Sequence, residues 1–355
     1  MKVPTGLAFW AFTASPLALG CAPDSGVIDP TTRSNDLRPL HSSERYSAWS
    51  GPPTNLGPLI NLPSPSTDQH PVLSKDGLTL YFASNRPENE ADTRLDQNIW
   101  VARRACTDMS PTVCAWSKPV MLGIAVNSQF LDASPTLSRD EHQLFFASQR
   151  ANGHCAVAPC DRDLWVSYRD NAHDDSPWQP AVNLGPPVNT NREEVAPSYF
   201  ENDDSGLPQL FFNDGVVNAA GVLTLGNIYV SQLGSDGTWG NPIPVDEPAE
   251  DPADLDRINT TFSDQRPSVS HDGRELYFHS TRLTPAGEVG LAHLWVATRR
   301  EVSDPWSTPV LVPAPISDEL TIHPFIHSHG KTETLLFVRS GDIWMSERAK
   351  IKAAE

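Results

Sequence analysis

The chain has 355 residues, including 33 proline and 21 glycine residues, and 26 basic against 44 acidic side chains give it a formal net charge of −18. Nucleic acid is excluded as a partner, because a phosphate backbone requires clustered lysine and arginine that this chain lacks. The many turn-forming residues also argue against long helices. Cationic ligands and basic protein surfaces remain compatible with the charge.

The first element in the chain has the layout of a secretion signal. Residues 1–20 contain one lysine and an apolar stretch from residue 7 to residue 19, which is too short to span a membrane. The following "LALGC" resembles the lipobox of bacterial lipoproteins, which implies acylation of Cys21. An ordinary cleaved signal followed by a chance cysteine is the alternative. We expect residues 21–45, polar and rich in proline and serine, to form a flexible tether.

A sixteen-residue phrase then recurs along the chain, which must be considered before any other pattern. "PVLSKDGLTLYFASNR" begins at Pro71, and similar phrases begin at Pro135 and Pro267, with longer degenerate copies from Pro197 and Pro324. Each copy is followed by a phrase of the type "NIWVARR" (residues 98–104), and a Trp-Pro phrase such as "WSKPVMLG" (residues 116–123) precedes the next copy. Short β-prone runs bounded by Asp-Gly turns predict three or four strands in each unit.

Units of about sixty residues with up to four short strands predict an all-β protein, a five-bladed β-propeller. The runs Leu80-Tyr81-Phe82 and Leu276-Tyr277-Phe278 are apolar on both faces, so each sheet should be covered on both sides. The aromatic residue of each "NIWVARR"-type phrase is then expected to fill the space between blades.

The phrase Pro-x-x-Ser-x-Asp-Gly-x-x-Leu-Tyr-Phe-x-Ser-x-Arg, followed by Asp/Asn-Ile/Leu-Trp-Val, resembles the WD40-like (PD40-type) repeat of TolB-like propellers. The resemblance implies that the proline strand is innermost and the Trp-Pro segment outermost. The propeller is expected over residues 46–348, with a tail at residues 349–355. Because the last unit lacks an outer strand, we expect the segment from Trp49 to Leu59 to complete it and to close the ring. Six blades are the alternative.

Acidic residues stand three positions before the repeat proline in four of the five copies. They are Asp68, Asp132, Glu194 and Asp264, with Thr321 in the fifth copy. One interpretation is a ligand site at the mouth of the channel, shared with His70, Arg266 and His323 on the same strand face. The other is that each acid caps a turn or pairs with an arginine of its blade, such as Arg86, Arg150 or Arg282.

Histidine and cysteine provide two further candidate sites. His323, His327 and His329 alternate along one strand and suggest a metal cluster, but no fourth ligand accompanies them, so we predict no metal and no cofactor. The remaining cysteines form two close pairs in loops, Cys106 with Cys114 and Cys155 with Cys160. In an exported protein these predict local disulfides, with a four-thiolate metal site as the alternative.

The functional prediction from these patterns rests partly on the resemblance. TolB-like relatives act as interaction platforms, which implies an exported, lipid-anchored, non-catalytic binding module of the bacterial envelope with a protein partner. Its expected location is the periplasm or cell surface, anchored at the outer membrane. The alternative is a carbohydrate-active or glycan-binding propeller that uses the acidic residues. The four acids are alike from blade to blade, whereas a glycosidase needs two carboxylates with different pKa values, so we predict no enzyme.

Overall fold

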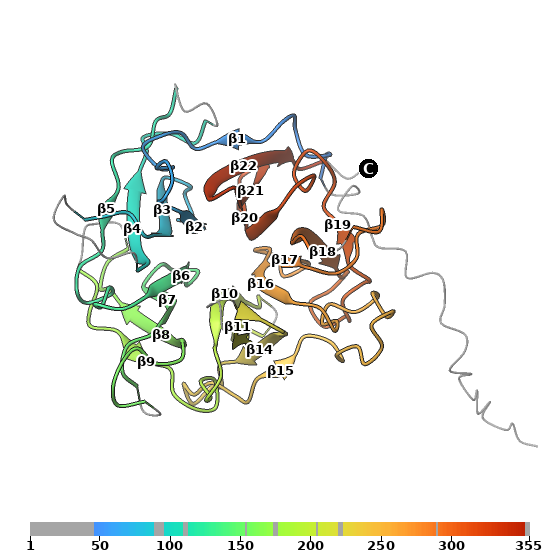
Figure 1. Cartoon of the computed structure of the whole chain (residues 1–355). Helices are drawn as coiled ribbons and strands as arrows, with labels where there is room; N and C mark the ends of the chain where they lie inside the picture. The colour runs from blue at the N-terminus through green and yellow to red at the C-terminus, as the bar shows by residue number, and fades with distance from the viewer. Residues whose placement is uncertain are drawn as a thin grey trace, which may run out of the picture. The chain divides into compact units, whose positions relative to one another are not determined.

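The computed structural model describes residues 46–88, 96–108, 113–152, 155–172, 177–203, 205–218, 223–288 and 290–351. They form five antiparallel four-stranded sheets around a common axis, which confirms the predicted five-bladed propeller (Figure 1). The signal segment, Cys21 and the tether lie outside the described residues. No helix in the described part of the chain is long and apolar enough to cross a membrane.

Blades 1, 2 and 4 follow the repeat most regularly, and their strands run outward in chain order. Blade 1 contains β2 (Asp68–Leu73), β3 (Thr79–Ser84), β4 (Asn98–Arg103) and β5 (Val120–Met121); blade 2 contains β6 (Asp132–Leu137), β7 (Gln143–Ser148), β8 (Asp163–Tyr168) and β9 (Val182–Asn183); blade 4 contains β16 (Asp264–Val269), β17 (Glu275–Ser280), β18 (His293–Thr298) and β19 (Val310–Leu311). The proline-containing strand lies nearest the axis in each of them, as expected (Figure 1).

Blades 3 and 5 depart from this scheme in different ways. Blade 3 contains β10 (Val195–Glu201), β11 (Pro208–Asn213), β14 (Ile228–Gln232) and β15 (Ile243–Pro244), with an inserted hairpin of β12 (Val216–Val217) and β13 (Leu223–Thr224). Blade 5 contains β20 (Thr321–His329), β21 (Thr332–Arg339), β22 (Asp342–Ala349) and, as its outer strand, β1 (Thr54–Asn55).

The apolar runs of the repeat form the cores between the sheets. Phe82 and Phe278 are fully buried, and the tryptophans Trp100, Trp165 and Trp295 are 5–8% exposed. Each sheet is covered on both faces by its neighbours, so strands that are apolar on both sides lose nearly all their contact with water.

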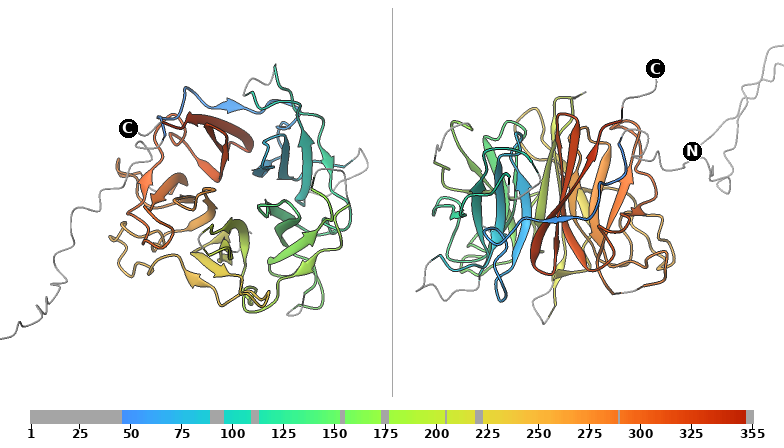
Figure 2. Two further views of the ribbon diagram at one scale, coloured as in Figure 1. Left: turned by 180° about the vertical axis from the view of Figure 1, so that it is seen from behind. Right: turned by 90° about the horizontal axis from the view of Figure 1, so that it is seen from above.

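The N-terminal segment closes the ring as predicted. Thr54 pairs with Met345 and Asn55 with Trp344, nearly three hundred residues later, and Tyr46 forms a further bridge with Lys350. Figure 2, viewed from behind, again places the blue N-terminal strand beside the red C-terminal strands. No blade is therefore left with an unpaired third strand facing solvent.

A second repeated contact ties each blade to the segment that leads to the next one. The side-chain amide of Asn127 accepts a hydrogen bond from the backbone N–H of Ile99 at 2.8 Å and donates to the carbonyl of the same residue at 2.9 Å. Asn61, Asn189 and Asn259 make the same pair of bonds to Ile343, Leu164 and Ile228, and Ser317 accepts from Leu294 in the last position. These side chains satisfy buried backbone groups where the outer strand ends.

We predict that Asn127→Ala lowers the free energy of unfolding by about 1–3 kcal/mol, because both backbone groups of Ile99 lose a buried partner. Asn127→Ser should cost less, since Ser317 accepts the corresponding N–H bond from Leu294 in blade 4. Urea unfolding followed by tryptophan fluorescence measures both values. Equal stability of Asn127→Ala and the wild type would show that the contact is dispensable.

Candidate functional site

The acidic residues of the repeat lie inside the blades rather than on the channel. Asp68, Asp132 and Asp264 are fully buried. Each pairs with the arginine that ends its own repeat phrase, at 2.5–2.7 Å: Asp68 with Arg86, Asp132 with Arg150 and Asp264 with Arg282. This is the second of the two interpretations offered by the sequence.

The second carboxylate oxygen of each of these aspartates accepts a hydrogen bond from the backbone. Asp68 accepts a hydrogen bond from the backbone N–H of Leu62, and the N–H groups of Ser128 and Thr260 donate to Asp132 and Asp264 in the same way. With both oxygens engaged, these three carboxylates hold the connecting segment against the inner strand. In the described structure, none of the three lines the central space of the channel or the 520 Å³ cavity beside it.

Glu194 is the exception among the four acids. The hairpin insert begins two residues after Asp214, so Val216 takes the place of the arginine, and Glu194 accepts hydrogen bonds from Thr190 instead. Burial raises the pKa of Glu194 to about 7, and the nearby carboxylates of Asp163 and Asp214 act in the same direction. Blade 3 therefore lacks the ion pair that three other blades share.

The residues that face the channel axis are those immediately before the repeat prolines. In this position every blade has a residue with positive φ, between 53° and 59°: His70, Ser134, Ala196, Arg266 and His323. The register of the inner strand shifts here in each blade, as between Gln265 and Ser268. This bulge separates His70, Arg266 and His323 from the acids two positions earlier, so the predicted common strand face is wrong.

These five residues close the channel across its middle. The guanidinium of Arg266 in blade 4 donates to the hydroxyl of Ser134 in blade 2 at 2.7 Å, a contact between blades that are not neighbours. His70 stacks on His323 with ring centroids 4.0 Å apart. The space left between them is only about 40 Å³, which is close to the volume of one water molecule.

On one side of this layer lies a cavity of about 520 Å³. Most of its lining residues are polar, although apolar atoms make up most of the lining surface; the polar residues are Arg162, Gln265, Arg266, His279 and His323, together with Thr224, Thr261, Ser263 and Thr281. Phe262 and the β13 residues Leu223 and Thr224 contribute to the same lining. No carboxylate of the described residues lines this cavity.

The insert of blade 3 is attached to this cavity by a hydrogen bond. The side-chain amide of Gln265, on the inner strand of blade 4, donates to the carbonyl of Leu223 at 3.2 Å. Sequence patterns did not single out Arg162, Gln265 or His279. The lengthened third copy of the repeat was no signal for them, because its extra residues lie in the turn between β10 and β11, away from the β12–β13 hairpin.

The histidines of the cavity are neutral near pH 7. Burial lowers the pKa of His279 to about 3, with Arg266 acting in the same direction. The pKa of His323 also lies well below its usual value, mainly through burial and then through His70 and Arg266. A neutral imidazole offers one hydrogen-bond donor and one acceptor, so this wall of the cavity suits hydroxyl groups.

The opposite mouth holds a larger cavity of about 1140 Å³ among the hairpin turns. Lys75, Arg103, Arg139 and Lys350 line it together with His329. His323 belongs to the central layer and lines the 520 Å³ cavity, whereas His329 lines this larger one, so the three histidines of β20 do not share one site. The described residues contain no group of three or more ligands that could hold a metal ion.

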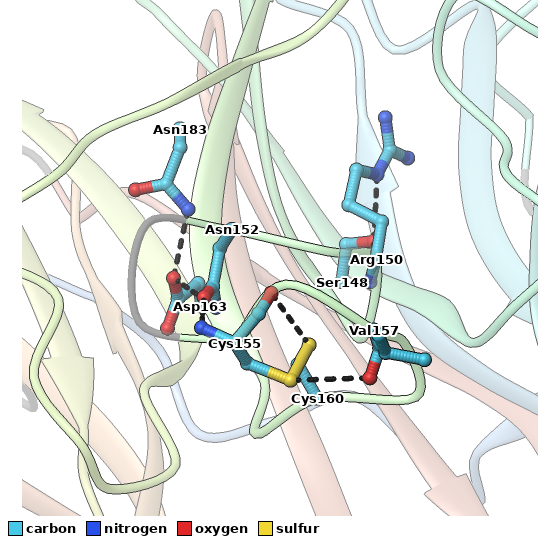
Figure 3. The surroundings of a disulfide bond; sticks show 8 residues. All are labelled: Ser148, Arg150, Asn152, Cys155, Val157, Cys160, Asp163 and Asn183. Carbon is cyan, nitrogen blue, oxygen red and sulfur yellow. Dashed lines mark hydrogen bonds between the residues drawn. A yellow bond between two sulfur atoms is a disulfide. The ribbon is translucent and has the colours of Figure 1, made fainter.

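Both predicted disulfides are present. Cys106 is bonded to Cys114, and Cys155 to Cys160. Beside the second bond, Asn152 and Asn183 both donate to the carboxylate of Asp163 at the start of β8 (Figure 3). This cross-link therefore lies in the loop between β7 and β8, which is tied to the third strand of blade 2 and also carries the cavity residue Arg162, two positions after Cys160.

The fold is similar to that of solved proteins that act on carbohydrates. The catalytic domain of a GH62 α-L-arabinofuranosidase from Coprinopsis cinerea is 13% identical, with a TM-score of 0.50 over 87% of this chain and 98% of that chain. A putative glycoside hydrolase from Bacteroides ovatus is 10% identical, with a TM-score of 0.52 over 86% and 98%. A β-1,2-mannobiose phosphorylase from Listeria innocua is 12% identical, with a TM-score of 0.50 over 84% and 96%. At these identities the likeness shows the fold alone. No family model and no curated protein matches the chain.

These comparisons contradict the prediction of a TolB-like, lipid-anchored envelope module. The propellers that share the fold are named for carbohydrates, and neither an envelope protein partner nor the absence of enzyme activity finds support among them. The physical reason for the error lies in the repeat phrase. Its proline lies in an inner strand, its Asp-Gly forms a hairpin turn and its arginine forms an ion pair. Any blade needs these features, so they do not identify a family.

We predict that Asp264→Ala lowers the free energy of unfolding by about 3–5 kcal/mol, because it leaves the fully buried Arg282 without its partner. Asp264→Ala with Arg282→Met should recover part of this loss. Asp203→Ala is the matched control, since the Asp203 side chain is 70% exposed in its pair with Arg139, and it should leave the stability nearly unchanged. Equal denaturation midpoints for the two single variants would contradict a structural role for Asp264.

We predict that Glu194 makes stability depend on pH. Its raised pKa means that the folded state holds this proton more tightly than the unfolded chain does, so its contribution is complete below about pH 4.5 and is lost as the pH rises through about 7. The loss should be on the order of 3 kcal/mol. The unfolding free energies of wild type and Glu194→Gln are measured from pH 4.5 to 8. We expect the value for wild type minus the value for Glu194→Gln to fall as the pH rises. The histidines are common to both proteins and cancel in this difference, so a rise with pH would refute the assignment.

Proposed function

We propose that the chain recognises a carbohydrate in the 520 Å³ cavity at the channel mouth. The proposal rests on the lining of the cavity, which combines Gln265, His279 and Thr281 with the aromatic ring of Phe262. Amides, hydroxyls and neutral imidazoles can each donate and accept hydrogen bonds, as sugar hydroxyls do. An aromatic ring offers an apolar face to the C–H surface of a sugar ring. The volume lies within the range of pockets that bind small ligands.

The place of the cavity in the propeller supports the proposal. Positions that are alike in all blades serve folding, as the buried ion pairs and the asparagine contacts show. The cavity lies where the blades differ from one another, between the β12–β13 hairpin of blade 3 and the inner strands of blades 4 and 5. Similar propellers are named as an arabinofuranosidase and as a complex with β-1,2-mannobiose, which makes a glycan a reasonable ligand for this chain.

The lining favours recognition over hydrolysis by two carboxylates. That mechanism needs two carboxyl groups about 5–9.5 Å apart on either side of the glycosidic bond. The described lining contains none, and the five channel-facing positions before the prolines are His70, Ser134, Ala196, Arg266 and His323. The nearby carboxylate of Glu193 is not part of the lining, and it forms an ion pair with the cavity residue Arg162.

We predict that the full chain binds oligosaccharides on a glycan array and that Thr261→Trp reduces this binding at least tenfold, because Thr261 is an exposed lining residue and a bulky ring there fills the mouth. Thr308→Trp, an equally exposed threonine at the outer strand of blade 4, is the control and should bind as the wild type does. Isothermal titration of the array hits gives the affinities, and chromatography of the same mixtures detects any cleaved product. An absence of binding to any glycan, or equal effects of both variants, would refute the proposal.

A further inference from the structure

Arg266 differs from the other buried arginines of the described structure. The buried arginines are Arg86, Arg169, Arg266, Arg282 and Arg348. Arg86, Arg282 and Arg348 form close ion pairs with carboxylates, and Arg169 has Glu141 at 3.6 Å. For Arg266 the described residues provide no carboxylate within 4 Å, although this residue is only 9% exposed.

The hydrogen bonds of Arg266 do not compensate for this. One terminal nitrogen donates to the hydroxyl of Ser134, and the Nε atom is buried without a partner. A guanidinium has five N–H donors in a fixed planar fork. Burying such a cation with unsatisfied donors is costly, and proteins normally place it beside a carboxylate.

The charges around the cavity leave one positive charge unbalanced. Arg162 and Arg266 are the cations of the lining, and Glu193, which pairs with Arg162, is the carboxylate whose charge also reaches Arg266. Burial lowers the pKa of Arg266 to about 9, with Arg162 acting in the same direction, so the group is still cationic near pH 7. The surrounding histidines His70, His279 and His323 are neutral there. This unbalanced cation is unusual in a chain with a net charge of −18.

We infer that the cavity binds an acidic carbohydrate, and that Arg266 receives the carboxylate of a uronic acid residue. This inference rests on the proposed function of the cavity and names its substrate class. A carboxylate is planar, carries the single negative charge that the site lacks, and accepts two parallel N–H bonds from a guanidinium. Gln265, His279 and Thr281 would then contact the hydroxyls of the same sugar.

The test compares paired ligands that differ at one carbon. The full chain is titrated calorimetrically with oligosaccharides of galacturonic acid and of galactose, and with oligosaccharides containing glucuronic acid or glucose. Each pair carries either a carboxylate or a hydroxymethyl group at C6. We expect one uronate to bind about 10- to 100-fold more tightly than its neutral partner, as charge-assisted hydrogen bonds imply. We expect this preference to weaken as salt concentration rises.

Two variants link the preference to Arg266. Arg266→Gln should abolish the preference for the uronate, and its melting temperature should equal or exceed that of the wild type, because a buried unpaired cation is removed. Arg266→Lys should retain part of the preference, since the charge remains but the planar fork is lost. Arg274→Gln is the matched control in the same blade, where Arg274 pairs with Glu301 at 2.9 Å on an exposed surface, and it should leave the preference intact.

The outcomes separate this inference from the proposed function. If neutral and acidic members of each pair bind equally, or if Arg266→Gln keeps the preference, the assignment of a uronate to Arg266 is overturned while glycan recognition stands. If Thr261→Trp has no effect on any bound glycan, or if no glycan binds, the proposed function fails and the inference fails with it.

Discussion

Closure of the ring depends on a pairing between the two ends of the propeller. The backbone groups of β22 would face solvent if β1 did not pair with them at Thr54 and Asn55. An open third strand in the last blade would leave its N–H and C=O groups without partners and would offer an edge for aggregation. The other features of the molecule require this closure, because each sheet is covered on both faces only when five blades stand in a complete circle.

Within the ring, repeated polar side chains hold the blades at their edges. The asparagine contacts satisfy backbone groups of the third strands, and the buried aspartate–arginine pairs secure the segments that enter the inner strands. Both devices occur wherever the repeat is regular, which is the expected behaviour of residues needed for folding. Blade 3, one of the two blades without this ion pair, also carries the β12–β13 hairpin beside the cavity, so the blade that departs from the repeated contacts is the one that borders the candidate site.

The layer of five residues across the channel divides it into two mouths that are lined by different residues. Five residues with positive φ precede prolines, a position where the backbone normally prefers an extended conformation. Because this conformation recurs in all five blades, it belongs to the way a blade is built. The side chains placed there differ from blade to blade and include a buried arginine and two stacked histidines.

Much of the fold could be predicted from the sequence, because it depends on local patterns that recur. Five copies of the phrase and two-sided apolar strands such as Leu80-Tyr81-Phe82 favour five blades, with six as the alternative, whereas the strand order and the closure by the first segment were implied by the resemblance to TolB-like repeats. The close spacing of Cys106 with Cys114 and of Cys155 with Cys160 likewise favours the two disulfides over a four-thiolate metal site. The same regularity misled the functional prediction, because the repeated acids and the phrase around them report how a blade is built.

Only the tertiary structure decided which side chains reach the channel. A one-residue bulge in each inner strand turns Arg266 and His323 to the axis and leaves Asp264 inside its blade, and alternation along a strand cannot reveal such a shift. The contact between Arg266 and Ser134 joins blades 2 and 4 over 132 positions of sequence. Whether a buried arginine has a carboxylate partner depends on such distant neighbours, so the unbalanced charge of Arg266 becomes visible only when all five blades are in place.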